Sequence, residues 1–190
     1  MAPLGGPMNV DEEDRYPFLR EEKRLLARCV EHAVPVLGIC LGSQLLAAVL
    51  GARVRKNERS EIGRMDVELT PAGRESRLFA GIESPLPVFQ WHGDTFEMPA
   101  DAHHLAQSPL CRNQAFGYKD LLIGLQFHIE ITQATAVEWA KAYAPDLEGG
   151  EKAAARKILE EAKQPWPEVM NRNAERIFEN FFLEIAGLRI

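Results

Sequence analysis

The chain has 190 residues, of which 46% are hydrophobic and 26% charged, and a formal net charge of -6. This composition is typical of a globular domain with an appendage, and the negative charge disfavours nucleic acid and anionic membrane surfaces as partners. Three cysteines without C-x-x-C spacing disfavour a disulfide framework and a zinc knuckle, so we expect a reducing, cytoplasmic location.

The first predicted elements are a helix, a strand and a second helix. Apolar residues recur every three or four positions over 18–33, which predicts an amphipathic helix that ends before Pro35. The apolar run 36–39 is typical of a strand buried on both faces, and a helix is predicted from Leu41 to Gly51. This succession indicates a layered α/β fold. The uncharged stretch 33–52 is long enough to span a membrane, but proline and glycine residues divide it.

Short strands are predicted after Gly51. A basic run over residues 53–64 begins in the first of these strands. Because Glu58 and Glu61 interrupt it, we interpret it as a solvated strand edge and loop, with binding of an anionic partner as the alternative. The last two strands are separated by a three-residue link and are expected to form a hairpin. The predicted strands cover residues 52–56, 66–70, 86–90, 103–107, 114–118 and 121–127.

Helices are predicted for the end of the chain. Thr132 is a suitable N-cap for a helix over 132–143. We expect a main domain over residues 1–144, a linker at 145–150 and a helical extension over 151–190. The extension contains predicted helices at 151–163 and 167–186, and the second carries an apolar stripe. We expect this stripe to pack on the main domain, and a docking surface for a partner is the alternative.

Cys40 lies in the pattern Gly38-Ile39-Cys40-Leu41-Gly42, between the predicted buried strand and the helix that follows. A sharp turn at this place would raise the cysteine above the sheet, and the flanking glycines avoid clashes in the turn. The positive end of the following helix favours the thiolate, which is the attacking species. The pattern therefore predicts a nucleophile, although a buried cysteine can also serve as a small apolar residue.

His128 and Glu130 follow the last predicted strand. Alternate side chains on an extended backbone point to the same side, so both can face one site. His128 would act as the base for a thiol nucleophile, and Glu130 would hold the imidazole. Local hydrogen bonds at the surface are the structural alternative. Zinc deaminases also use H-x-E, but they need a P-C-x-x-C segment that the sequence lacks, so we expect no metal and no cofactor.

Together these segments resemble the class I glutamine amidotransferase family. The resemblance rests on 38–44 and 124–130, on Leu4-Gly5-Gly6-Pro7, which is similar to a glycine turn of the family, and on 88–94, which is similar to a segment of its stand-alone, GMP-synthetase-like members. It covers residues 4–132. The resemblance implies a flavodoxin-like, three-layer α/β domain with a mostly parallel central sheet.

The resemblance also implies roles for individual residues. Cys40, His128 and Glu130 would form a catalytic triad that releases ammonia from glutamine through a thioester. The backbone N–H of Leu41 and one from Gly5 or Gly6 would form the oxyanion hole. Gln44 would contact the substrate. A synthetase that accepts ammonia and a second copy of the chain are the implied protein partners.

Three departures from the family pattern leave alternatives open. Ser43 and Ile129 stand where many members have histidine and proline. The family's first strand-helix-strand has no counterpart before Gly5, so we expect an N-terminally incomplete sheet in which 36–39 forms an exposed edge. The alternative functions are a hydrolase of γ-glutamyl peptides or conjugates that uses the same triad, and an inactive homologue that acts as a binding protein.

Overall fold

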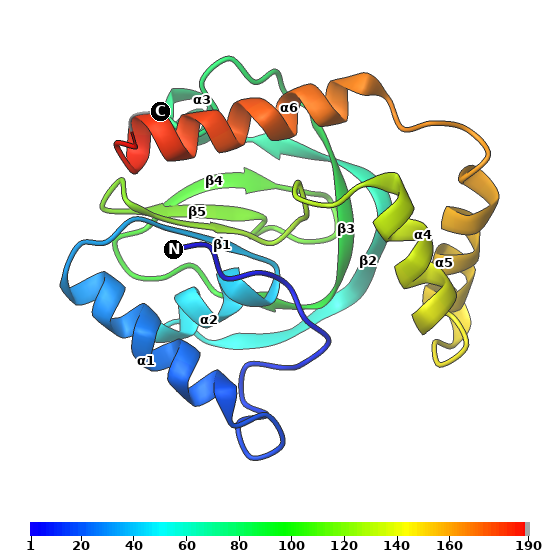
Figure 1. The fold of residues 1–190 in the computed structure, drawn as a ribbon, viewed down its shortest axis with the longest axis horizontal. Coiled ribbons are helices and arrows are strands. Elements are labelled where there is room, and N and C mark those ends of the chain that lie inside the picture. Colours follow the sequence, from blue (N-terminus) through cyan, green and yellow to red (C-terminus); the bar gives the residue numbers. More distant parts are fainter. Residues whose placement is uncertain (189–190) are drawn as a thin grey trace.

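The protein consists of a curled six-stranded sheet with helices on both faces (Figure 1). The computed structural model describes residues 1–188. The strand order is β1-β6-β5-β4-β2-β3. The strands are β1 (Val36–Ile39), β2 (Val54–Leu69), β3 (Leu86–Phe96), β4 (His103–Gln107), β5 (Ala115–Tyr118) and β6 (Leu122–Leu125). The helices are α1 (Phe18–Glu31), α2 (Leu41–Val49), α3 (Pro71–Glu75), α4 (Gln133–Tyr143), α5 (Gly149–Glu161) and α6 (Glu168–Glu179), which continues as the π-helical turn η1 (Asn180–Ile185).

The α/β class is confirmed, but the expectation of a mostly parallel sheet is wrong for the described residues. β1 pairs with β6 in parallel, whereas β2–β3, β2–β4, β4–β5 and β5–β6 are antiparallel. Short connections explain part of the difference, because the segments that join β4 to β5 and β5 to β6 are too short to link parallel neighbours. The predicted hairpin of β5 and β6 is such a case, with positive φ at Lys119 and Asp120 in its turn.

β2 is a single strand of 16 residues, where the sequence predicts two short strands. Its pairing with β3 shifts register between Lys56 and Glu61, and such a bulge lets a strand bend without ending. Glu61 is 1% exposed, so the interpretation of the whole basic run as solvated is wrong at this position. The short helix α3 is also absent from the predicted elements.

β1 is not an exposed edge strand, contrary to the expectation. The backbone N–H of Leu37 donates to Met1 O at 3.0 Å, and the N–H of Ile39 donates to Pro3 O at 2.9 Å. The amino group of Met1 donates to Pro35 O at 2.8 Å. Residues 1–3 thus run alongside β1 and satisfy donors that the expected edge would have left open.

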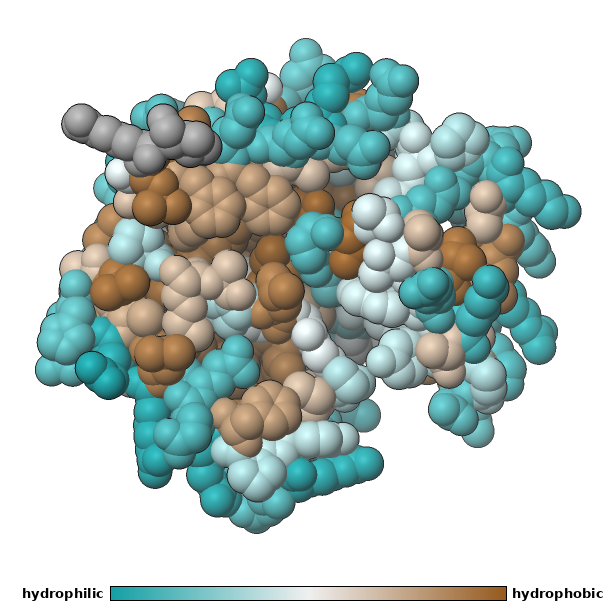
Figure 2. Space-filling model, viewed as in Figure 1, coloured by the Kyte–Doolittle hydropathy of each residue, from teal (hydrophilic) through white to brown (hydrophobic). Residues whose placement is uncertain are grey.

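Apolar side chains on the two faces of the sheet form separate clusters. Val36 points into the cluster under α1 and α2, and its neighbour Leu37 points into the cluster under α6 and η1. This alternation follows from the two-residue period of a strand, and burial of each such side chain contributes about 1.5–3 kcal/mol. Hydrophilic residues follow the outer side of α6, and hydrophobic residues gather beneath it (Figure 2).

The C-terminal helices form two groups. α6 and η1 lie across one face of the sheet and bury Met170, Ile177, Phe181 and Ile185 from the predicted apolar stripe. α4 and α5 lie beside the bend of β2 and β3 (Figure 1). They pack around Phe89 in a third hydrophobic cluster. Residues 189 and 190 of the predicted extension lie outside the described residues.

Candidate active site

Cys40 occupies a strained turn between β1 and α2. Its φ of 53° and ψ of -112° are rare for a residue with a side chain, and such strain costs on the order of 1–3 kcal/mol. The flanking glycines permit the turn: a Cβ on Gly38 would lie 2.6 Å from Gly42 O, and one on Gly42 would lie 2.2 Å from Pro3 O. The N–H of Cys40 donates to Leu125 O at 2.8 Å, which fixes the nucleophile candidate against β6.

His128 reaches the same edge of the sheet from β6. Ile39 and Leu125 are partners in the parallel β1–β6 pair, so the residues that follow the two strands emerge side by side. The backbone of His128 is held by Phe89, since His128 N–H donates to Phe89 O at 2.8 Å and Phe89 N–H donates to His128 O at 3.3 Å. Two residues far apart in the sequence are therefore positioned by adjacent strands.

The imidazole of His128 lies between the sulfur of Cys40 and the carboxylate of Glu130. Its Nδ1–H donates to Glu130 Oε1 at 2.7 Å, and Glu130 Oε2 accepts from the N–H of Ile129 at 3.0 Å. Because Nδ1 is occupied, Nε2 is left to hydrogen-bond with Cys40. A Cβ on Gly5 would lie 2.9 Å from His128 Cε1 and 3.7 Å from Cys40 Sγ, so Gly5 borders both groups.

The surroundings of His128 favour its charged form. Burial alone lowers the pKa of His128, but the hydrogen bond and charge of Cys40 outweigh it, and Glu130 adds to their effect. Together they raise the pKa to about 10. The arrangement therefore suits an imidazolium that faces a thiolate.

The three backbone donors expected to bind an oxyanion lie around Cys40. A Cβ on Gly5 would be 3.3 Å from Cys40 Cβ, and one on Gly6 would be 3.2 Å from Leu41 Cδ2. Leu41 is the first residue of α2, so its N–H has no acceptor within the helix. In the described part of the chain, no hydrogen bond uses the N–H of Gly5 or Gly6. These groups are free to bind a ligand.

Two adjoining cavities open beside Cys40. The smaller, of about 250 Å³, is lined by His128, and the larger, of about 570 Å³, is lined by Gln44 and Lys56. Gln44 is 4% exposed, and its Nε2 donates to Gln126 Oε1 at 3.1 Å and to Asp94 O at 3.3 Å. Gln44 therefore joins α2 to the wall of the larger cavity.

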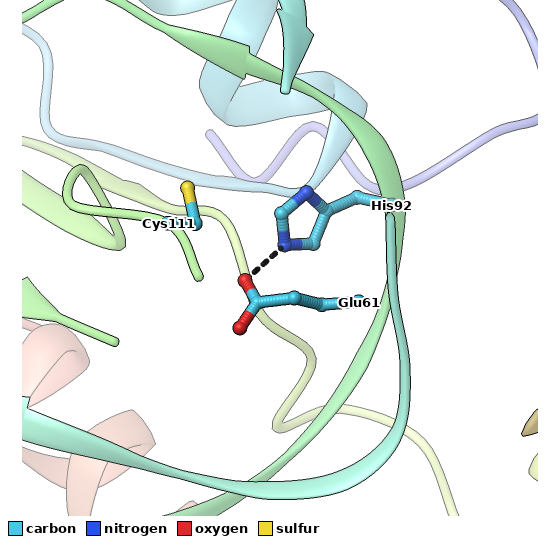
Figure 3. A group of neighbouring side chains, drawn as sticks. All are labelled: Glu61, His92 and Cys111. Carbon is cyan, nitrogen blue, oxygen red and sulfur yellow. Dashed lines mark hydrogen bonds and ion pairs between the residues drawn. The ribbon is translucent and has the colours of Figure 1, made fainter. Parts of the chain in front are cut away.

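A buried hydrogen-bonded pair, His92 and Glu61, lies next to that wall (Figure 3). His92 Nδ1 is 2.8 Å from Asp94 O, and its Nε2 is 3.1 Å from Glu61 Oε2. Both ring nitrogens therefore face oxygen atoms of the protein. The carboxylate of Glu61 also accepts hydrogen bonds from Gln114 and Ser108. His92 and Glu61 thus hold the segment next to the cavity in place.

Cys111 lies beside this pair, and the three residues could offer a metal ion one donor atom each within 4.8 Å of one another. Their donors already have protein partners: Cys111 Sγ is 3.2 Å from Thr95 Oγ1. Burial raises the pKa of the Cys111 thiol, although the Thr95 hydrogen bond opposes this, and a protonated thiol is a poor ligand. The cluster fits a hydrogen-bond network better than a metal site.

Comparison with known proteins identifies the family. The family model for class-I glutamine amidotransferases matches residues 4–139. The chain belongs to this family. It is 39% identical over 132 residues to the glutamine amidotransferase-like protein YfeJ of Salmonella typhimurium, an alignment that covers 68% of this chain and 55% of that protein. It is 35% identical over 111 residues to one subunit of the glutamine-hydrolysing GMP synthase of Pyrococcus abyssi, covering 57% of each.

The amidotransferase fold extends beyond the matched segment. A glutamine amidotransferase crystal structure from Thermotoga maritima superimposes with a TM-score of 0.81 at 36% identity, covering 98% of this chain and 78% of that one. The chain spans only about half the length of the curated relatives named above. Within residues 1–188, no helix combines the length and apolar character needed to cross a bilayer.

Several residues at this candidate site are not indicated by the sequence. Trp139 lies edge-on to His128, with ring centroids 5.1 Å apart, and Trp91 and Tyr143 also line the smaller cavity. In the sequence, Trp139 is simply an apolar residue of an amphipathic helix. Glu61 has a partner in His92, but only the cross-strand register of β2 and β3 brings the two together. No local pattern in the sequence indicates these contacts.

Proposed function

We propose that this chain is a glutaminase that releases ammonia from glutamine through a thioester on Cys40. The observation that carries the proposal is the position of the His128 imidazole, which lines the same cavity as Cys40 and borders Gly5 together with it, and which hydrogen-bonds Glu130 through Nδ1. Family membership supports amidotransferase activity, and this arrangement supports the triad as its chemical basis.

The proposed reaction has two steps. The Cys40 thiolate attacks the amide carbon of glutamine, and the N–H groups of Gly5, Gly6 and Leu41 stabilise the negative oxygen. The C–N bond breaks as the His128 imidazolium gives its proton to the departing nitrogen, which leaves as ammonia. His128 then accepts a proton from water, the resulting hydroxide attacks the thioester, and the C–S bond breaks to release glutamate.

The larger cavity suits the amino-acid end of glutamine. Lys56 offers a cation for the α-carboxylate, and Glu58, Asp94 and Glu151 supply negative groups for the α-ammonium. Gln44 lines the same cavity within one helical turn of Cys40, which supports its proposed contact with the substrate. The glutamyl chain would then extend from this cavity to the sulfur.

An ammonia acceptor is the partner that this function requires. The relative from Pyrococcus abyssi belongs to a glutamine-hydrolysing GMP synthase made of separate subunits, so a separate synthetase chain is the proposed partner here. An inactive binding protein, in which no oxyanion hole would be assembled, is less well supported. Gly5 and Gly6 lie beside Cys40 and Leu41 instead.

Covalent labelling tests the proposal. The purified chain is incubated with a diazo-ketone analogue of glutamine, and the adduct is mapped by mass spectrometry. We expect labelling of Cys40, which lines both cavities, and not of Cys29 or Cys111, which line neither. Labelling distributed over all three cysteines, or none at all, would contradict the proposed nucleophile.

A histidine pair provides the matched control. His128→Ala should slow labelling by at least about 100-fold, because proton transfer by a positioned side chain contributes 10²–10⁴-fold. His103→Ala, at an exposed position outside both cavities, should label at the wild-type rate. Circular dichroism checks that both variants fold. Equal labelling rates in the two folded variants would exclude His128 as the base.

A further inference from the structure

The two cavities share Cys40, Trp91 and Tyr143 but differ in the rest of their lining. In the proposed reaction, which this inference assumes, His128 protonates the departing nitrogen, so the leaving group must lie on the side of His128. His128 lines the smaller cavity and not the larger one, whereas Gln44 and Lys56 line only the larger one. The smaller cavity is therefore the leaving-group side.

Aromatic rings form the walls of this smaller cavity. Trp91 comes from β3, and Trp139 and Tyr143 come from α4. The rings support one another: the centroids of Trp91 and Trp139 are 6.2 Å apart with perpendicular planes, and those of Trp91 and Tyr143 are 6.1 Å apart. Edge-to-face contacts of this kind stabilise a fixed arrangement of rings. The cavity wall is thus a preformed aromatic surface.

Ammonia does not fill this space. A molecule of its size occupies roughly 30 Å³, as water does, and the cavity has a volume of about 250 Å³. A site that only released ammonia would need a narrow exit rather than an aromatic chamber. The volume and the lining both suit a flat organic group attached to the departing nitrogen.

The charges of the residues that line the smaller cavity favour an uncharged leaving group. The described residues that line the smaller cavity are Gly5, Gly6, Pro7, Cys40, Trp91, His128, Trp139 and Tyr143. His128 is the cation among them, and it is already paired with Cys40 and Glu130. The carboxylate of an amino-acid leaving group would have no cation to pair with, and burying it would be costly. An uncharged aromatic amine would meet no such cost.

The geometry points to a γ-glutamyl arylamide as a further substrate of this site, with its aromatic amine held by Trp91, Trp139 and Tyr143. The Cys40 sulfur forms a bond to the γ-carbon, the C–N bond breaks, and the His128 proton passes to the arylamine nitrogen. Water then cleaves the thioester to give glutamate and restores the thiol. The reaction needs no oxidant, reductant or further reactant.

Three substrates test this inference: L-glutamine, γ-glutamyl anilide and γ-glutamylglycine. We expect the wild-type protein to hydrolyse the anilide, and γ-glutamylglycine much more slowly, since its leaving group carries a carboxylate. Hydrolysis of glutamine without hydrolysis of the anilide would overturn the inference and leave the proposed function intact. If Cys40 is not labelled by the diazo-ketone and glutamine is not hydrolysed, the proposed function fails, and this inference fails with it.

An aromatic residue on the cavity wall gives the decisive variant. Tyr143→Ala should lower the ratio of kcat/KM for the anilide to kcat/KM for glutamine by about three- to tenfold, because it removes one ring from the wall. The ratio cancels effects on the shared glutamyl group. Phe182→Ala, which truncates a ring of similar exposure outside the cavity (38% against 41% for Tyr143), should leave the ratio unchanged. An equal ratio in the two variants would overturn the inference.

Discussion

Replacing Glu130 by glutamine isolates the contribution of its charge. In the wild type, one carboxylate oxygen accepts from His128 Nδ1–H at 2.7 Å and the other accepts from the N–H of Ile129 at 3.0 Å. An amide has only one oxygen and cannot accept both bonds in this geometry. If the amide oxygen stays with Ile129, its NH₂ group faces Nδ1, and the proton of the imidazole must then move to Nε2, beside Cys40. His128 could no longer take the proton of the thiol.

The size of the effect follows from the lost hydrogen bond. A hydrogen bond to a charged group contributes about 1.5–3 kcal/mol, which corresponds to roughly 1–2 pKa units. Glu130 helps to raise the pKa of His128 to about 10, so Glu130→Gln should bring that pKa down to roughly 8–9. The misplaced proton should also lower kcat on the order of 10²- to 10⁴-fold.

The pH profile of glutamine hydrolysis measures this shift. The imidazolium is the acid of the first step, so kcat/KM should be retained below the pKa of His128 and fall as the pH rises through it. We expect the alkaline limb near pH 10 in the wild type and roughly one to two units lower in Glu130→Gln. Glu97→Gln, at an exposed position, should keep the wild-type limb. An unmoved limb in Glu130→Gln would refute the assignment of His128 as the titrating acid.

The remaining predictions concern stability. The folded-state pKa of His128 lies above its ordinary value of 6.5. Protonated His128 should therefore contribute fully to the free energy of unfolding below about pH 6.5, and this contribution should be lost as the pH rises through about 10. A Tm that did not fall over this pH range would contradict the prediction. Gly42→Ala should destabilise or misfold the chain, because its Cβ would lie 2.2 Å from a backbone oxygen, whereas Gly150→Ala has open space and should not change the urea midpoint. Glu61→Ala should lower the free energy of unfolding by about 1–3 kcal/mol, because it leaves the buried side chains of His92 and Gln114 without their hydrogen-bond partner. A loss no larger than that in Glu160→Ala, at an exposed position on α5, would show that the buried pair is not stabilising.

The local parts of the site could be predicted from the sequence, because each depends on a short segment. The strand, turn and helix around Cys40 follow from an apolar run, two glycines and a second apolar stretch. The common direction of His128 and Glu130 follows from the period of an extended chain. The proximity of His128 to Cys40 depends on the pairing of β1 with β6, which no short segment of the sequence indicates.

The parts that could not be predicted depend on contacts between distant segments. β2 remains one strand through a polar stretch because β3 pairs with it along most of its length. Glu61 is buried because His92 lies opposite it on β3. Trp139 reaches His128 because α4 packs beside the bend of these strands. No pattern within ten or fifteen consecutive residues indicates any of these arrangements.

The residues that line the smaller cavity come from the beginning, the middle and the later part of the chain, and they include Gly5, Cys40, Trp91, His128 and Trp139. No fragment shorter than residues 5–139 carries all five, so products truncated within that range should lack activity even where they retain helices. Loss of turnover on heating should then coincide with the global melting transition and not precede it. Enzymatic activity would thereby report whether the whole polypeptide has reached its native state.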